Sequence, residues 1–245
     1  MNLALKPLLA VPAVPRQVRY PLPDQLRGFA IVLMVLFHGW YDLSIFDMVA
    51  MDFDHLFWRS FRAIIVGLFC LMAGASLYWT HHKGIRWRLL GRRQFQLILA
   101  AGSLTVFSLL AYPSAWIYFG ILHFFVIALV VSLPLVRFPR TATLAGLILV
   151  VAERLGAPFT DPWLSIALQQ HIGLPKSTID RMYLLPWLGV VWMGIGLGAH
   201  PIMRAAWQPR ALRPLTWMGQ HPLMLYLVHQ PILFSLAWLV YWATA

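Results

Sequence analysis

Residues 26–46 read LRGFAIVLMVLFHGWYDLSIF, an apolar run with one arginine near its start and a histidine and an aspartate near its end. About 20 apolar residues are enough to cross the hydrocarbon core of a bilayer as a helix. The run therefore predicts a membrane-spanning helix. Ionisable groups at membrane depth are costly and tend to mark function, so His38 and Asp42 are the first candidates for chemistry.

The composition extends this reading to the whole chain. Hydrophobic residues make up 60% of the 245 residues, and charged residues make up only 11%. A soluble domain carries about 25% charged residues, so this chain could not cover a water-facing surface of its size. We therefore expect an all-α fold, with a cytoplasmic N-terminal arm at 1–20 and a single transmembrane domain at 21–245. The single cysteine, Cys70, excludes an internal disulfide and any multi-cysteine metal site.

The hydrophobic pattern predicts a polytopic bundle of about seven transmembrane helices. Their expected bounds are Leu26–Phe46, Phe61–Trp79, Phe95–Tyr112, Trp116–Val136, Thr143–Arg154, Leu184–Ala199 and Trp217–Tyr241. The fifth is short, and its ends are the least defined. An odd number of crossings would place the two termini on opposite sides of the membrane.

The formal charge of +11 is explained by this topology rather than by a nucleic-acid partner. Alternating loops put 14 of the 19 Lys and Arg residues on one side and five on the other. Because positive residues favour the cytoplasmic side, we expect the N-terminus inside and the C-terminus outside. The most basic inner loop is residues 80–93, THHKGIRWRLLGRR.

Polar side chains within three of the predicted spans suggest a buried site. His38 and Asp42 are spaced i,i+4, so they share a helix face and can hydrogen-bond. A carboxylate at one imidazole nitrogen fixes the tautomer and leaves the other nitrogen as a base. The same spacing also suits a simple packing hydrogen bond between helices.

His123 and His229 lie at comparable depth in two other spans, and Gln230 follows His229. Three histidines on three helices, together with one carboxylate, favour a polar active cavity within the membrane. The chain contains no H-x-x-x-H or H-E-x-x-H pattern, so we expect no metal.

Five blocks of sequence then form a family pattern in chain order. They are DQLRGFAIVLMVLFHGWYDL, LFCLMAGASL, YFGILHFFVIAL, DRMYLLPWLGVVWMGIGLG and MGQHPLMLYLVHQPIL. Together, over about residues 19–235, they resemble the small bacterial members of the heparan-alpha-glucosaminide N-acetyltransferase catalytic-domain family. The family's motif residues in this chain are Asp24, Arg27, Gly28, His38, Asp42, Gly120, His123, Asp180, Pro186, Trp187, Gly219, Tyr226, His229 and Gln230.

The resemblance implies a transmembrane acyltransferase of the bacterial inner membrane, surrounded by membrane lipid. Such an enzyme takes an acetyl or other acyl group from cytoplasmic acyl-CoA, with acetyl-CoA as the expected donor. It passes that group to a sugar amine or hydroxyl of an envelope glycan on the outer side. The resemblance leaves a homodimer open.

The reaction that the resemblance implies suggests roles for the candidate residues, of which Asp180 and Trp187 are candidates through the resemblance alone. Acyl transfer needs a base, donors for the developing oxyanion and an anion clamp for coenzyme A. The catalytic candidates are His38, Asp42, His123 and His229, and the substrate-binding candidates are Asp180, Trp187, Tyr226 and Gln230. The candidates for binding coenzyme A are Arg27, Lys83, Arg86, Arg92 and Arg93, although topology and anionic lipid also account for such a basic cluster.

A second-choice catalytic residue lies in the predicted outer loop. Larger family members place an active histidine in a His-x-x-Trp-x-Gly context. This chain keeps His55 and Trp58, but Ser60 replaces the glycine.

Two other classes of function remain open at this point. A proton-coupled transporter could use His38, Asp42 and His229 as a proton relay. A non-catalytic membrane subunit is the third hypothesis. The absence of an internal repeat mildly disfavours the transporter.

Overall fold

The computed structural model describes residues 20–156, 174–175, 178, 180–205 and 209–244. Within these ranges the regular structure is helical, which confirms the all-α prediction. The α-helices are α1 (Pro21–Ile45), α2 (Leu56–His81), α3 (Trp87–Ala111), α4 (Ile121–Val131), α5 (Pro139–Arg154), α7 (Trp187–Ala199), α8 (Arg213–Gln220) and α9 (Pro222–Thr244). Three short 3-10 helices join them: η1 (Leu133–Arg137), η2 (Pro201–Arg204) and η3 (Arg210–Leu212). Almost all of the predicted N-terminal arm lies outside the described residues.

Four of these helices, α1, α2, α3 and α9, are long and apolar enough to cross a membrane. They support an integral membrane protein. Helices α4, α5 and α7 have only 11, 16 and 13 residues. The seven crossings and the side assigned to each terminus therefore stay predictions.

Two predicted spans are interrupted at recognisable positions. Within the predicted span Trp116–Val136, only the part that forms α4 is α-helical. The 3-10 helix η1 follows α4, with Pro134 near its start. Proline lacks the N–H group that would continue an α-helical ladder. The span Trp217–Tyr241 is divided at His221, after which Pro222 begins α9. Proline is favoured at such a first helical position.

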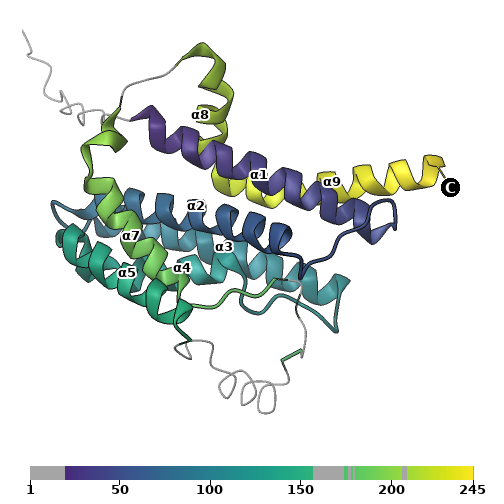
Figure 1. The fold of residues 1–245 in the computed structure, drawn as a ribbon, viewed down its shortest axis with the longest axis horizontal. Coiled ribbons are helices and arrows are strands. Elements are labelled where there is room, and N and C mark those ends of the chain that lie inside the picture. The colour runs from purple at the N-terminus through teal and green to yellow at the C-terminus, as the bar shows by residue number, and fades with distance from the viewer. Residues whose placement is uncertain (1–19, 157–173, 176–177, 179, 206–208, 245) are drawn as a thin grey trace, which may run out of the picture.

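The helices form two groups (Figure 1). Helices α1, α8 and α9 lie along one side of the bundle, and α2, α3, α4, α5 and α7 make up the rest. Helix α1 approaches α8 so closely that a Cβ atom at Gly28 would overlap the backbone of Leu215. A Cβ atom at Gly219 would likewise overlap the backbone of Asp24. Small residues permit this close packing of helices within a membrane.

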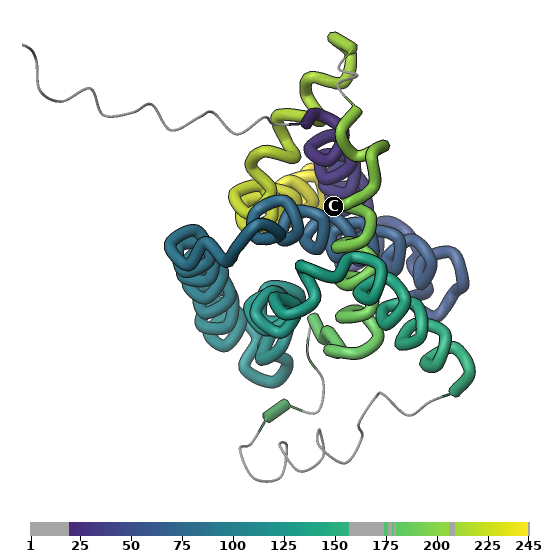
Figure 2. The backbone as a smooth tube through the Cα atoms, turned by 90° about the vertical axis from the view of Figure 1, so that its left-hand side faces the viewer, coloured from purple at the N-terminus to yellow at the C-terminus, as the bar shows by residue number. Residues whose placement is uncertain are grey.

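Helix α3 stands at the edge of the bundle beside α4 (Figure 2). Its buried face contributes Leu90 and Leu97 to a core cluster that also holds Leu122 and Leu129 of α4. Its outer face exposes large apolar side chains, among them Phe95, Ile98, Leu99 and Phe107. Such a surface suits contact with lipid rather than with water.

Tyr226 of α9 lies where the interior clusters meet. Its side chain packs against all three buried hydrophobic clusters of the described residues. The face of α9 that carries Tyr226 therefore points into the centre of the bundle.

Candidate functional site

His38 of α1 and His229 of α9 face each other, with ring centroids 4.8 Å apart. The Nδ1 atom of His38 lies 2.9 Å from the carbonyl of Met34, and that of His229 lies 2.7 Å from the carbonyl of Tyr226. A carbonyl can only accept a hydrogen bond, so in both rings Nδ1 carries the proton. Each Nε2 atom then keeps its lone pair, so either histidine can act as a base.

Asp42 is fully buried one turn further along α1. Its Oδ1 atom accepts a hydrogen bond of 2.6 Å from Nε2 of Gln230. The expectation that Asp42 orients His38 is therefore corrected: Met34 orients His38, and α9 holds Asp42. The reason is that helical side chains lean toward the N-terminus, so the ring of His38 meets the carbonyl one turn before it.

Three buried atoms in or next to this pair have no hydrogen-bond partner within the part of the chain that the structure describes: Oδ2 of Asp42, Oε1 of Gln230 and Nε2 of His229. We call these three residues the acceptor cluster, because each of the unpaired atoms accepts hydrogen bonds. A buried polar group without a partner costs about 1–3 kcal/mol. A ligand group rich in donors, such as an amine, would satisfy the acceptor cluster.

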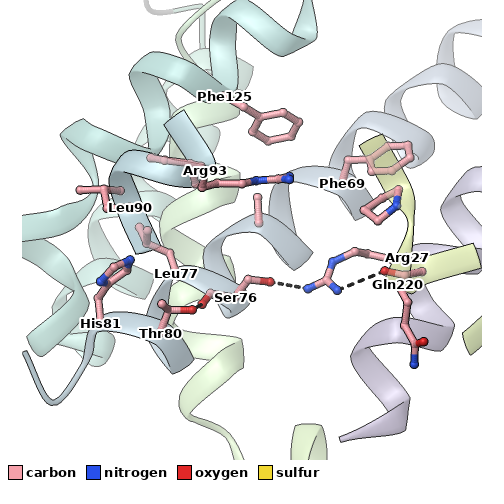
Figure 3. A pocket seen from close by; sticks show the side chains of 14 residues that line it. Arg27, Phe69, Ser76, Leu77, Thr80, His81, Leu90, Arg93, Phe125 and Gln220 are labelled. Atoms are coloured by element: carbon pink, nitrogen blue, oxygen red, sulfur yellow. Dashed lines mark hydrogen bonds between the residues drawn. The ribbon is translucent and has the colours of Figure 1, made fainter. Parts of the chain in front are cut away.

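A cavity of about 370 Å³ opens nearer the end of the bundle where α1 begins (Figure 3). Figure 3 shows the guanidinium groups of Arg27 and Arg93 directed into it from different walls. The full lining consists of Arg27, Phe69, Ala73, Ser76, Leu77, Thr80, His81, Leu90, Arg93, Phe125, Leu129, Gly219, Gln220 and Pro222. The cavity thus combines two cations with apolar and small polar walls.

The two arginines differ in their partners. Arg27 donates to Oδ1 of Asp24 at 2.9 Å, to the hydroxyl of Ser76 and to two backbone carbonyls, one of them that of Gly219. It therefore ties α1 to α2 and α8. Arg93 has no hydrogen bond or ion pair to any residue that the structure describes. Its donors remain available for an anion such as a phosphate.

A comparison with protein-family models matches residues 19–231 to "Heparan-alpha-glucosaminide N-acetyltransferase, catalytic". The chain belongs to this family. The family's name implies N-acetyltransferase activity, and the four helices long and apolar enough to cross a membrane fit an integral membrane protein. The curated proteins and the solved structures gave no significant match.

The other basic residues predicted to hold coenzyme A lie outside the cavity of this family member. Lys83, Arg86 and Arg92 are exposed, and none of them lines it. Sequence reasoning missed Ser76 and Thr80, although their i,i+4 spacing in an apolar span was a usable signal. It also missed Gln94, a buried amide on α3 with no partner within the described residues.

His123, a motif residue of the family, has both ring nitrogens occupied. Nδ1 accepts from the N–H of Gly120 at 3.3 Å, so Nε2 carries the proton and lies 3.0 Å from the hydroxyl oxygen of Thr105. The ring therefore closes the first turn of α4. No hydrogen bond or ring contact within the described residues joins His123 to the His38–His229 pair.

Asp180 also holds the start of α4. Its Oδ2 atom accepts from the N–H of Ile121 at 3.1 Å, and a Cβ atom at Gly120 would overlap this carboxylate. Burial raises the pKa of Asp180, against the opposing effects of the Ile121 N–H and Arg62. The glycine of the family motif thus makes room for the carboxylate that caps the helix.

The remaining family candidates occupy different places. The ring of Tyr226 lies 5.7 Å from that of His229, so it borders the pair. Trp187 begins α7 and packs against a core cluster. His55 is exposed and caps α2, where its Nδ1 atom accepts from the N–H of Phe57 at 3.2 Å.

Proposed function

We propose that this protein is a membrane-bound N-acyltransferase that uses acyl-CoA as its donor and an amine-bearing glycan as its acceptor. In the reaction the thioester C–S bond breaks and an amide C–N bond forms. An acceptor bound as the ammonium loses two protons: one passes through a base to the departing thiolate of coenzyme A, and the other is released to water. The acceptor cluster, which includes His229 and lies next to His38, is the observation that carries this proposal.

The acceptor cluster explains a preference for an amine. A protonated amine brings three donors, whereas a hydroxyl brings one. The unpaired oxygens of Asp42 and Gln230 can hold the ammonium form. An Nε2 lone pair of the histidine pair then removes a proton, which makes the nitrogen nucleophilic. We assign His38 as the base and His229 as its neighbour.

The cavity supports the donor half of the proposal. Arg93 offers unpaired donors to the phosphates of coenzyme A, and Arg27 keeps the wall in place. Arg27 and His38 are eleven residues apart on α1, which is about 16 Å along a helix. The phosphates of the donor and the amine of the acceptor would therefore bind at different depths of the bundle. The excess of positive charge near the cavity end predicts that the donor enters from the cytoplasm.

Radiolabelled acetyl-CoA and the purified protein in lipid nanodiscs test this proposal. Label should pass to glucosamine and not to N-acetylglucosamine, whose nitrogen is already acylated. Proton-linked solute flux in proteoliposomes without any incorporation of label would reverse the assignment in favour of a permease. Equal labelling of both sugars would point to a hydroxyl acceptor and contradict the role given to the acceptor cluster.

A further inference from the structure

We infer that Phe69 of α2 and Phe125 of α4 form the inner wall of the cavity and set the length of the acyl chain that can be transferred. This inference rests on the proposed function and specifies its donor. Both residues line the cavity, and neither is among the candidate site residues named from the sequence.

The cavity runs along α2 from His81 to Phe69. These residues are twelve positions apart, which is about 18 Å along a helix. Figure 3 shows the rings of Phe69 and Phe125 away from His81 and Thr80, with the two guanidinium groups between. The two rings therefore close the apolar end of the cavity.

Phe69 also packs against residues that surround the proposed base, His38. Phe69 packs against the core cluster that contains Met34 and Phe37. The carbonyl of Met34 holds the ring of His38, and Phe37 touches that ring edge-on at 5.5 Å. Phe69 thus packs against a cluster that includes two residues in contact with His38.

Phe125 provides the matching side on α4. It packs against the two core clusters that also contact Tyr226. The ring of Tyr226 in turn borders His229. Phe69, Phe125 and Tyr226, from α2, α4 and α9, therefore pack against shared interior clusters.

This arrangement restricts the donor because its reacting carbon must approach the histidine pair. With the phosphates held near Arg93, the acyl group becomes the deepest part of the bound donor. A longer chain would then meet the rings of Phe69 and Phe125. Replacing one of these rings by a methyl group leaves a space large enough for several carbon atoms. The surrounding side chains relax into such a space only partly. Each additional buried methylene group is worth about a fourfold change in affinity.

The decisive measurement compares kcat/KM for acetyl-, butyryl- and hexanoyl-CoA with glucosamine as the acceptor. Phe69→Ala and Phe125→Ala should each raise the hexanoyl-to-acetyl ratio by about tenfold or more. Ala73→Leu narrows the same cavity and should lower the butyryl-to-acetyl ratio. Phe95→Ala serves as the matched control, because Phe95 is 68% exposed on α3 and does not line the cavity.

A changed ratio cannot result from partial unfolding, since the same protein sample is tested with each donor. If either phenylalanine variant fails to fold, the other and Ala73→Leu still decide the question. Unchanged ratios in the variants that fold would overturn the inference and leave the proposed function intact. A wild-type protein that transfers no acyl group from any of the three thioesters would instead overturn the proposed function.

Discussion

Replacing His38 by alanine separates catalysis from packing. The structural contribution of the ring is one hydrogen bond to Met34 and edge contacts with Phe37 and His229. A neutral hydrogen bond contributes about 0.5–1.5 kcal/mol net. For a chain of this size, 1 kcal/mol corresponds to a Tm shift of about 2–4 °C. We therefore expect His38→Ala to lower Tm by only a few degrees.

The expected loss of activity is much larger. General base catalysis contributes about 10²–10⁴-fold to a rate. That range equals about 2.7–5.4 kcal/mol of transition-state stabilisation, which exceeds the expected loss in folding free energy. The initial rate of acetyl transfer to glucosamine should fall by this factor in protein that still binds acetyl-CoA.

His82→Ala is a closely matched control. Its Nδ1 atom makes the same 2.9 Å hydrogen bond to the carbonyl four residues back, that of Tyr78, but the ring lies at the opposite end of the bundle. This variant should lose a similar amount of stability and retain its rate. The double variant His38→Ala with His229→Ala should be little slower than His38→Ala alone, because residues that act as a unit are not additive. A His38→Ala rate above one tenth of wild type, or an equal loss in His82→Ala, would refute the assignment.

Three further predictions concern the cavity and the packing around it. Arg93→Gln should raise KM for acetyl-CoA by tenfold or more with little change in Tm. Arg27→Gln should mainly lower Tm, because it breaks the link between α1, α2 and α8. The reverse pattern in steady-state kinetics and thermal unfolding would exchange the roles of the two arginines. Gly28→Ala should destabilise the protein by about 1–3 kcal/mol or more, because its methyl group meets the backbone of Leu215, and an unchanged Tm would show that α1 and α8 can separate freely. Asp180→Asn should remove a pH dependence of stability. The raised pKa of Asp180 means that folding favours the protonated carboxyl group. The stability of the wild-type protein therefore falls as the pH rises from the unfolded pKa of about 4 through the folded pKa. Because asparagine can still accept from the α4 N-terminus, Tm of the variant in this window should be flat and at least equal to wild type, and a steeper dependence would contradict the burial argument.

Much of the fold could be read from the chain alone because helix formation is a local property. Apolar runs of sufficient length predicted the ends of α1, α2 and α9 to within five residues, whereas α3 begins eight residues before its predicted start. The same signal overestimated α4, because hydropathy does not register the change to a 3-10 helix at Pro134. It also joined α8 to α9 across His221, where the helix is interrupted although the sequence on both sides stays apolar.

The candidate site was less predictable because hydrogen-bond partners are chosen by tertiary packing. His38, Asp42, His229 and Gln230 were identified from the sequence as polar residues in apolar spans. Their pairing was not, since Asp42 takes a partner 188 positions away rather than the histidine one turn before it. Helix periodicity places residues on a face, but only the packing of α1 against α9 decides what that face meets.

The arginines show the same division between local and tertiary information. The sequence by itself determined that Arg27 and Arg93 lie near helix starts at the basic end of the bundle. Only the tertiary structure decided that Arg27 is held by Asp24 and Ser76, whereas Arg93 faces a cavity and has no partner among the described residues. The physical reason is that charge and hydropathy depend on residue type, whereas the pairing of a charge depends on which helices lie within reach of it.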